Sequence, residues 1–317
     1  MGPPERIESA PQGSFAPATT PSRDRLLYAY DRSDFDIYRF RSAQPAEPVM
    51  ASSSVDYGPR ISPDGRRIAF ESWRSGSVKE IWLADVDGQN PVQLTHVAAD
   101  PGQPARGTGA PFWSPDGQHI VHARVEERGS TAVSNLWVIG VDGSSDRRLT
   151  NGSLWLGPPV WSRDGRFIYY REDRPDGRDY VRIPATGGAP ERITHRGALL
   201  AEESWDGKWL LHSTSEGRGP LFLLSLDGGK DRQIEDCALS RALASSPGAF
   251  YYIGCPSGLE DPLYRYDPAS GRRERLGTIE KGSGAVMGLA VSRDTQTILH
   301  GRDMPAGSDL MMVENFR

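Results

Sequence analysis

Apolar and polar positions along the chain repeat with a long period. Seven times, an acidic or turn residue is followed by an aliphatic and then an aromatic or apolar residue, as in Glu80-Ile81-Trp82. The copies begin at positions 36, 80, 135, 179, 220, 262 and 309, so consecutive copies start 41 to 55 residues apart. This spacing is typical of a four-stranded propeller blade. The pattern therefore predicts one domain of repeated antiparallel units.

A turn motif runs in step with these strands. Ser62-Pro63-Asp64-Gly65 precedes an apolar run, and related copies stand at 114–117, 162–165, 204–207, 246–248 and 292–294. Pro presets φ, Asp can accept a bond from its own backbone, and Gly takes the positive φ that closes a tight hairpin. Hairpin turns such as Asp87-Gly88, each followed by a short outer strand, close the units.

These markers predict an all-β, seven-bladed propeller of four-stranded antiparallel blades. The expected blades are residues 11–50, 53–95, 107–150, 156–194, 198–235, 237–278 and 285–316 plus 4–9. The last unit lacks an outer strand, and Pro4-Glu5-Arg6-Ile7-Glu8 resembles the outer strand at 190–194. We therefore expect residues 4–9 to complete the last blade and protect its free edge. A six-bladed ring is the alternative.

Composition agrees with a single turn-rich domain. The chain has 35 Gly and 25 Pro among 317 residues and is 25% charged. No stretch approaches the ~20 apolar residues of a membrane-spanning helix, and no apolar signal-peptide core follows Met1. The net charge of -5 disfavours binding to nucleic acid, which needs a basic surface. We expect a monomer without membrane insertion or direct nucleic-acid binding.

A family resemblance rests on these motifs. The run 61–70 with Glu80-Ile81-Trp82 and Gln93-Leu94-Thr95 resembles the TolB-type, WD-like propeller repeat of bacterial proteins, over nearly the whole chain. Segments 276–281 and 307–317 resemble the C-terminal propellers of acidobacterial-type regulators, where the propeller follows a winged-helix domain or a Ser/Thr kinase domain. The resemblance implies binding to proteins or small ligands and no transferable catalytic residues. TolB's own propeller is counted as six-bladed.

The sequence contains no motif that indicates a reaction. A Gly-x-Ser-x-Gly elbow, a phosphate-binding Gly loop with its Lys, and His-Glu-x-x-His are all missing. We expect a non-catalytic binding or sensory propeller of a larger bacterial regulatory or envelope system. Its partner would be an unknown protein or a small polar ligand, and no cofactor is expected. The alternative is a propeller enzyme, such as a metal-dependent protein resembling polysaccharide lyases.

Three histidines are the weak candidates for a metal site. His122, His212 and His300 each lie at the same position of a second strand, five residues after the last turn residue. Equivalent positions in non-neighbouring blades should lie far apart, so core histidines in place of aromatics are the favoured interpretation. The metal interpretation draws on seven-bladed oligogalacturonate lyases, which use histidines to hold a metal, although no matching motif is present.

Two cysteines are candidates for a disulfide. Cys237 and Cys255 each lie nine residues from Ser246, so a simple hairpin would place them opposite each other on adjacent strands. Such a separation suits a disulfide, and unpaired thiols in a reducing cytosol are the equal alternative. The chain could act in the cytoplasm or the periplasm. A disulfide would favour a compartment outside the cytoplasm.

Charged residues interrupt two innermost strands and suggest a binding site. Arg60 and the pair Glu202-Glu203 stand where other blades carry apolar residues, so we expect them to face the central channel. The loops at 73–79, 126–134, 173–179 and 256–261 vary, whereas the turns on the opposite rim are uniform. We place recognition on the variable rim. The candidates there are Asp56, Tyr57, Arg106 and Trp155.

Overall fold

The regular structure is built from strands. The computed structural model describes residues 14–19, 25–31, 34–52, 54–76, 78–97, 107–128, 131–151, 156–174, 177–194, 198–256, 260–280, 286–304 and 308–314. Every regular element in these segments is a β-strand. Within the same segments, no helix has the length and apolarity that crossing a membrane requires.

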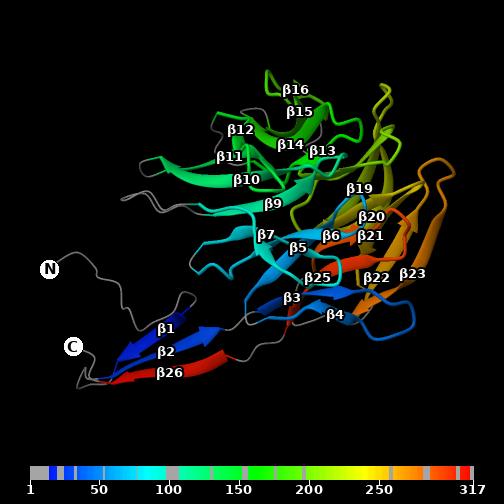
Figure 1. Ribbon diagram of the computed structural model, residues 1–317. Coiled ribbons are helices and arrows are strands. Elements are labelled where there is room, and N and C mark those ends of the chain that lie inside the picture. Colours follow the sequence, from blue (N-terminus) through cyan, green and yellow to red (C-terminus); the bar gives the residue numbers. More distant parts are fainter. Residues whose placement is uncertain are drawn as a thin grey trace.

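Three four-stranded antiparallel sheets follow one another along the chain (Figure 1). The first contains β5 (Asp56–Ile61), β6 (Arg67–Ser72), β7 (Glu80–Asp85) and β8 (Val92–Gln93). The second contains β9 (Thr108–Trp113), β10 (His119–Arg128), β11 (Thr131–Gly140) and β12 (Arg147–Arg148). The third contains β13 (Val160–Trp161), β14 (Phe167–Arg174), β15 (Gly177–Pro184) and β16 (Glu191–Arg192). Each sheet has the predicted order of strands from inner to outer.

The next sheet has seven strands because one long strand serves two units. Its members are β17 (Leu200–Glu203), β18 (Trp209–Ser213), β19 (Arg218–Ser225), β20 (Arg232–Ser246), β21 (Ala249–Gly254), β22 (Glu260–Tyr266) and β23 (Arg273–Glu280). The first part of β20 pairs with β19 and its last part pairs with β21. The sequence predicted a boundary between units at residue 236. The structure has a continuous strand there.

The sheet that completes the ring joins distant parts of the chain. It contains β24 (Val286–Val291), β25 (Ile298–Met304), β3 (Asp34–Arg39) and β4 (Glu47–Met50), in that order. In this register His300 lies opposite Tyr38 and Gly301 opposite Ile37. The rings of His300 and Tyr38 stack with centroids 6.2 Å apart. Pairing between β25 and β3 therefore links the last sheet to the start of the chain.

This pairing differs from the expected one. The sequence placed 309–316 beside 297–301, but β26 (Ser308–Glu314) pairs with β2 (Arg25–Asp31), which also pairs with β1 (Ser14–Thr19). This three-stranded sheet lies apart from the others (Figure 1). Both 36–38 and 309–311 carry the same strand pattern, so local sequence alone does not choose between them. The expected closing strand, residues 4–9, lies outside the described residues.

The inner strands form a closed cycle, and apolar layers fill the spaces between the sheets. Strands β5, β9, β13, β17, β20 and β24 contact one another in this order, and β24 contacts β5. One buried layer joins Ile37 and Leu299 of the closing sheet to Ile68 and Phe70 of the next. Similar layers follow around the ring. Burial of these side chains holds neighbouring sheets together.

The repeated turn has the structure that its sequence predicts. Ser62 Oγ donates to Asp64 Oδ1 at 2.6 Å and accepts from the amide of Arg67 at 2.9 Å. Gly65 has φ of 75°, where glycine has no steric penalty. The turn at 292–297 keeps the Ser292 to Asp294 bond at 2.6 Å, although its fourth residue is Thr295 with φ of 61°.

Candidate functional site

A large cavity opens at one end of the central channel. Its volume is about 760 Å³. Its wall contains residues from the first halves of the inner strands, from second strands and from the starts of third strands. Residues of the variable rim, including Trp73, Lys79 and Arg178, contribute to this wall. We call it the wide cavity. It lies on the side where the sequence predicted recognition.

A buried charge cluster forms one side of the wide cavity. Lys79 Nζ donates to a Glu71 carboxylate oxygen and, at 3.2 Å, to the hydroxyl of Tyr57. Burial and the Glu71 carboxylate raise the pKa of Tyr57 to about 12. Burial alone would lower the pKa of Lys79, but Glu71 and Tyr57 raise it overall. Both the ammonium and the neutral phenol therefore persist at neutral pH.

A second cluster of paired charges lies across the cavity. Arg171 Nη1 lies 3.3 Å from Glu216 Oε1, and its Nε lies 3.3 Å from Asp173 Oδ1. Arg178 contacts the same Glu216 oxygen at 3.1 Å. The two arginines balance the charges of the two carboxylates, so these four side chains carry no net charge.

Arg241 is the cavity's unpaired cation. It is exposed, lines the wide cavity and makes no ion pair within the described part of the chain. It lies in a bulge of β20, where the register with β21 shifts between Ala238 and Leu243. Ser240, the preceding residue, donates from its hydroxyl to Gly217 O at 2.8 Å. The bulge therefore has a fixed backbone, and Arg241 is presented to the cavity.

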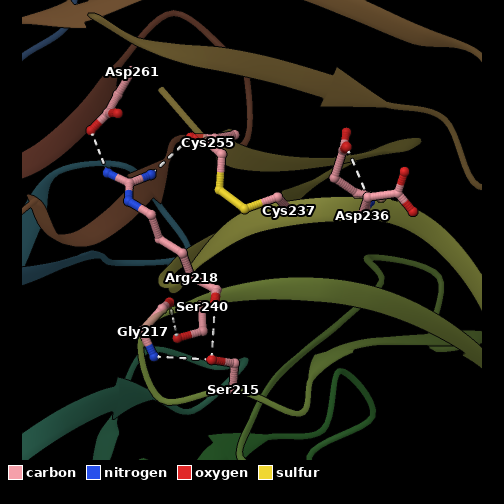
Figure 2. The surroundings of a disulfide bond; sticks show 10 residues. Ser215, Gly217, Arg218, Asp236, Cys237, Ser240, Cys255 and Asp261 are labelled. Carbon is pink, nitrogen blue, oxygen red and sulfur yellow. Dashed lines mark hydrogen bonds and ion pairs between the residues drawn. A yellow bond between two sulfur atoms is a disulfide. The ribbon is translucent and has the colours of Figure 1, made fainter. Parts of the chain in front are cut away.

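A disulfide fastens this bulge (Figure 2). Cys237 and Cys255 are bonded, with Cα atoms 5.4 Å apart. If the register that pairs Ser246 with Ala249 continued, Ser240 would lie opposite Cys255, and the bulge places Cys237 there instead. The predicted pairing is thus present, but it depends on the bulge rather than on a simple hairpin. Beside it, Arg218 binds Asp261 at 2.8 Å and Gly254 O at 3.1 Å.

An ion pair crosses the channel below the wide cavity. Arg60 of β5 and Glu202 of β17 lie 3.2 Å apart, although two inner strands separate β5 from β17 in either direction around the cycle. Glu202 also accepts from Arg163 Nη2 at 3.2 Å and from Ser245 Oγ at 2.9 Å. Arg60 lines the wide cavity and a second one of about 260 Å³, so the pair lies where the two meet. We call the second one the narrow cavity.

The structure distributes the predicted site residues unevenly. Arg60 and Glu202 face the channel as expected, whereas Glu203 lines neither cavity and accepts from the Arg163 amide and the Tyr169 hydroxyl. Burial raises the pKa of Glu203 to about 7. Asp56 is fully buried and bound by Arg74 at 2.6 Å, so it holds a loop rather than facing solvent.

The remaining predicted residues fall into two groups. Tyr57 lines the wide cavity. Arg106 and Trp155 lie outside the described residues. Arg241 and the narrow cavity were not predicted, because the sequence pattern of 237–246 is that of a plain hairpin strand and the Ser-x-Asp motifs indicate turns only.

The three histidines lie in three different sheets. His122, His212 and His300 are all buried, on β10, β18 and β25. His212 Nε2 lies 2.9 Å from Asp231 Oδ1, and burial lowers the pKa of His300 to about 4. Among the described residues, no group of three or more His, Cys, Asp or Glu side chains is placed to hold a metal. Each histidine thus fills a core position separately.

Several bacterial proteins are similar to this chain in sequence. No family model matches the chain. The uncharacterised protein Atu1656 of Agrobacterium fabrum is 25% identical over 278 residues, covering 80% of this chain and 85% of that protein. The putative tricorn protease homolog 2 of Streptomyces coelicolor is 41% identical over 214 residues, 63% of this chain and 18% of that protein. The uncharacterised peptidase YuxL of Bacillus subtilis is 25% identical over 166 residues, 50% of this chain and 21% of that protein. The chain spans about a fifth of the length of these two peptidase relatives.

Solved structures decide the fold. TolB from Acinetobacter baumannii superimposes with a TM-score of 0.58 at 17% identity, over 88% of this chain and 67% of that one. The chain has a TolB-like β-propeller fold. An oligogalacturonate lyase in complex with manganese has a TM-score of 0.50 at 11% identity, over 87% of this chain and 98% of that one. At such identities the likeness concerns the TolB-like propeller fold alone.

Proposed function

We propose that this TolB-like propeller is a non-catalytic recognition module whose ligand binds in the wide cavity. The observation that carries the proposal is a cavity of about 760 Å³ on the variable rim, lined by an exposed cation, Arg241, that makes no ion pair with any described residue. Such a volume lies within the range of ordinary ligand pockets. The module would serve a larger bacterial regulatory or envelope system, through a protein partner or a small polar ligand.

The charge arrangement favours a ligand with a carboxylate. Lys79, Arg171 and Arg178 already bind acidic side chains of the same wall. Arg241 is the cation left to pair with a ligand, and a guanidinium binds a carboxylate through two parallel hydrogen bonds. Two relatives are named as a peptidase and a protease homolog. A peptide with a free carboxylate is therefore the ligand class that we propose.

We also infer six blades rather than the seven expected from the markers. The support is the cycle of inner strands β5, β9, β13, β17, β20 and β24. In this interpretation β20 ends one blade and begins the next, while β3 and β4 complete the blade of β24 and β25. The sheet of β1, β2 and β26 would then be an addition to the ring.

Calorimetry with a short peptide tests the proposal. We expect Gly-Gly-Gly with a free C-terminus to bind and its C-terminal amide to bind at least tenfold more weakly, which corresponds to about 1.4 kcal/mol. Arg241→Ala should weaken the free acid to the level of the amide. Arg272→Ala, an exposed arginine on a hairpin turn, is the matched control and should leave binding unchanged. Equal binding of acid and amide would contradict the proposal.

The enzyme alternative has its own test. The fold likeness to a manganese-containing oligogalacturonate lyase makes manganese the metal to try. The alternative requires stoichiometric Mn²⁺ that is lost in His122→Ala. His122 is fully buried and belongs to no group of three or more possible metal ligands among the described residues. We therefore expect no such binding.

A further inference from the structure

Residues at the second position of the repeated turn surround the mouth of the narrow cavity. Pro63, Pro115, Arg163, Trp205 and Arg293 occupy this position in their turns, and all five line the cavity. Proline suits this position because it presets φ. Three of the five turns have replaced it with arginine or tryptophan, which the turn itself does not need. These replacements meet in space over one opening.

The three replacements form a stack. The Arg163 guanidinium carbon lies 4.7 Å from the centroid of the Trp205 ring, and that of Arg293 lies 5.7 Å from it. Both distances are in the range of cation–π attraction. Arg163 is also bound by Glu202 and Ser245 at the base of the cavity. One indole therefore positions two guanidiniums at the mouth.

The narrow cavity carries an excess of positive charge. Among the described residues, its wall contains the three arginines Arg60, Arg163 and Arg293 and one acid, Glu202, an excess of two positive charges in a chain whose net charge is -5. Glu202 is already bound by Arg60 and Arg163. Arg293 is exposed and makes no ion pair within the described segments. A concave wall of one sign attracts ligands of the opposite sign.

We propose that the narrow cavity is a second binding site, which takes a carboxylate of an acidic peptide segment. Arg293 would bind the carboxylate, Arg163 would add to the field, and the Trp205 face would pack against the aliphatic stem. The volume of about 260 Å³ is below that of ordinary ligand pockets, so it suits one inserted side chain or chain end. The Arg60–Glu202 pair separates this site from the wide cavity, and the proposal does not depend on the ligand proposed there.

Fluorescence polarisation with labelled tetraglutamate, capped at both ends, tests this site. We expect binding that weakens at least tenfold for the tetraglutamine analogue, because the analogue has the same shape without charge. Arg293→Ala should weaken tetraglutamate binding at least fivefold. Two exposed arginines that line neither cavity serve as matched controls: Arg66→Ala on the same rim and Arg272→Ala on a hairpin turn should both leave it unchanged. Melting curves of each variant show whether the fold is intact.

Competition identifies the source of the carboxylate. If uncapped Gly-Gly-Gly displaces tetraglutamate in the wild type but not in Arg293→Ala, a chain end also fits the site and the proposal stands. If inorganic phosphate displaces the peptide as well as unlabelled tetraglutamate does, the site is a general anion site and the proposal is overturned. It is also overturned if tetraglutamine binds equally well, if tetraglutamate does not bind, or if Arg293→Ala binds like the wild type.

Discussion

Arg60 and Glu202 are separated by 142 positions in the sequence, yet their side chains form an ion pair of 3.2 Å across the channel. The Glu202 side chain is 3% exposed and that of Arg60 25%. An acid with so little access to water is stabilised only while its partners stay in place. The pair thus ties opposite sides of the ring together and divides the channel into two cavities.

Removing one partner of this pair should destabilise the fold. We expect Arg60→Ala to lower the free energy of unfolding by about 2 kcal/mol, less than for an isolated buried pair because Arg163 still binds Glu202. A double-mutant cycle with Glu202→Gln, measured by urea unfolding, should give a coupling of about 1 kcal/mol or more. Arg166→Ala breaks the exposed pair with Asp164 and should cost less than about 0.5 kcal/mol. Additive effects of Arg60→Ala and Glu202→Gln would contradict the pairing.

Reduction of the disulfide should loosen the bulge that presents Arg241. Cys237 and Cys255 are separated by 18 residues, and a loop of this length corresponds to about 3 kcal/mol of stabilisation. We expect dithiothreitol to lower the melting temperature of the wild type and to leave a Cys237→Ala, Cys255→Ala double variant unchanged. Titration of two free thiols in denatured, unreduced protein would show that the bond is absent.

Thr295 should be a position where glycine stabilises the fold. Its φ of 61° is unfavourable for a β-branched residue. Gly117 has φ of 68° at the equivalent place in another turn. We expect Thr295→Gly to raise the free energy of unfolding by roughly 0.5–1 kcal/mol, after the greater freedom of glycine in the unfolded chain is included. Gly117→Thr, the reverse change, should destabilise. Thermal melts of both variants check the pair, and a destabilised Thr295→Gly would contradict the reasoning.

Glu203 should make stability depend on pH near neutrality. Burial raises its pKa to about 7, so between about pH 4.5 and 7 the folded state holds a proton that the unfolded state has released. The free energy of unfolding contributed by this group therefore falls as the pH rises through that window. The fall is on the order of 3 kcal/mol. Glu203→Gln should remove it, so the difference between variant and wild type should favour the variant more at pH 8 than at pH 4.5. A difference that does not change with pH would contradict this ionisation.

Local sequence was sufficient to predict much of the fold. Each Ser-x-Asp motif fixes a turn by the Ser to Asp bond, as in Ser62–Asp64, and therefore fixes the hairpin of an inner and a second strand. The order of strands inside a unit follows from that. Local sequence does not determine which strand closes the ring, because Asp36-Ile37-Tyr38 and Asp309-Leu310-Met311 have equivalent patterns. The choice depends on long-range packing, such as Tyr38 against His300.

The residues of the two candidate sites could be predicted only in part from the sequence. Arg60 and Glu202 were found because they interrupt apolar patterns. Arg241 was not predicted, because a shift of register within β20 determines where its side chain lies. No residue pattern in the sequence indicates that shift. The narrow cavity did leave a signal in the replacement of proline by Arg163, Trp205 and Arg293. That signal becomes meaningful only when the turns are known to meet around one opening.

Closure of the ring by β25 and β3 is the claim on which both cavities depend, and a designed cross-link tests it most directly. Asp303 lies opposite Phe35 in this register, whereas the hairpin expected from sequence, in the register of β10 and β11, would place Asp303 opposite Ser308. We predict that Phe35→Cys with Asp303→Cys oxidises to a disulfide, detected by mass spectrometry of peptides, and raises the melting temperature. Failure of this pair to cross-link, together with ready cross-linking of Asp303→Cys with Ser308→Cys and a raised melting temperature, would contradict the closure.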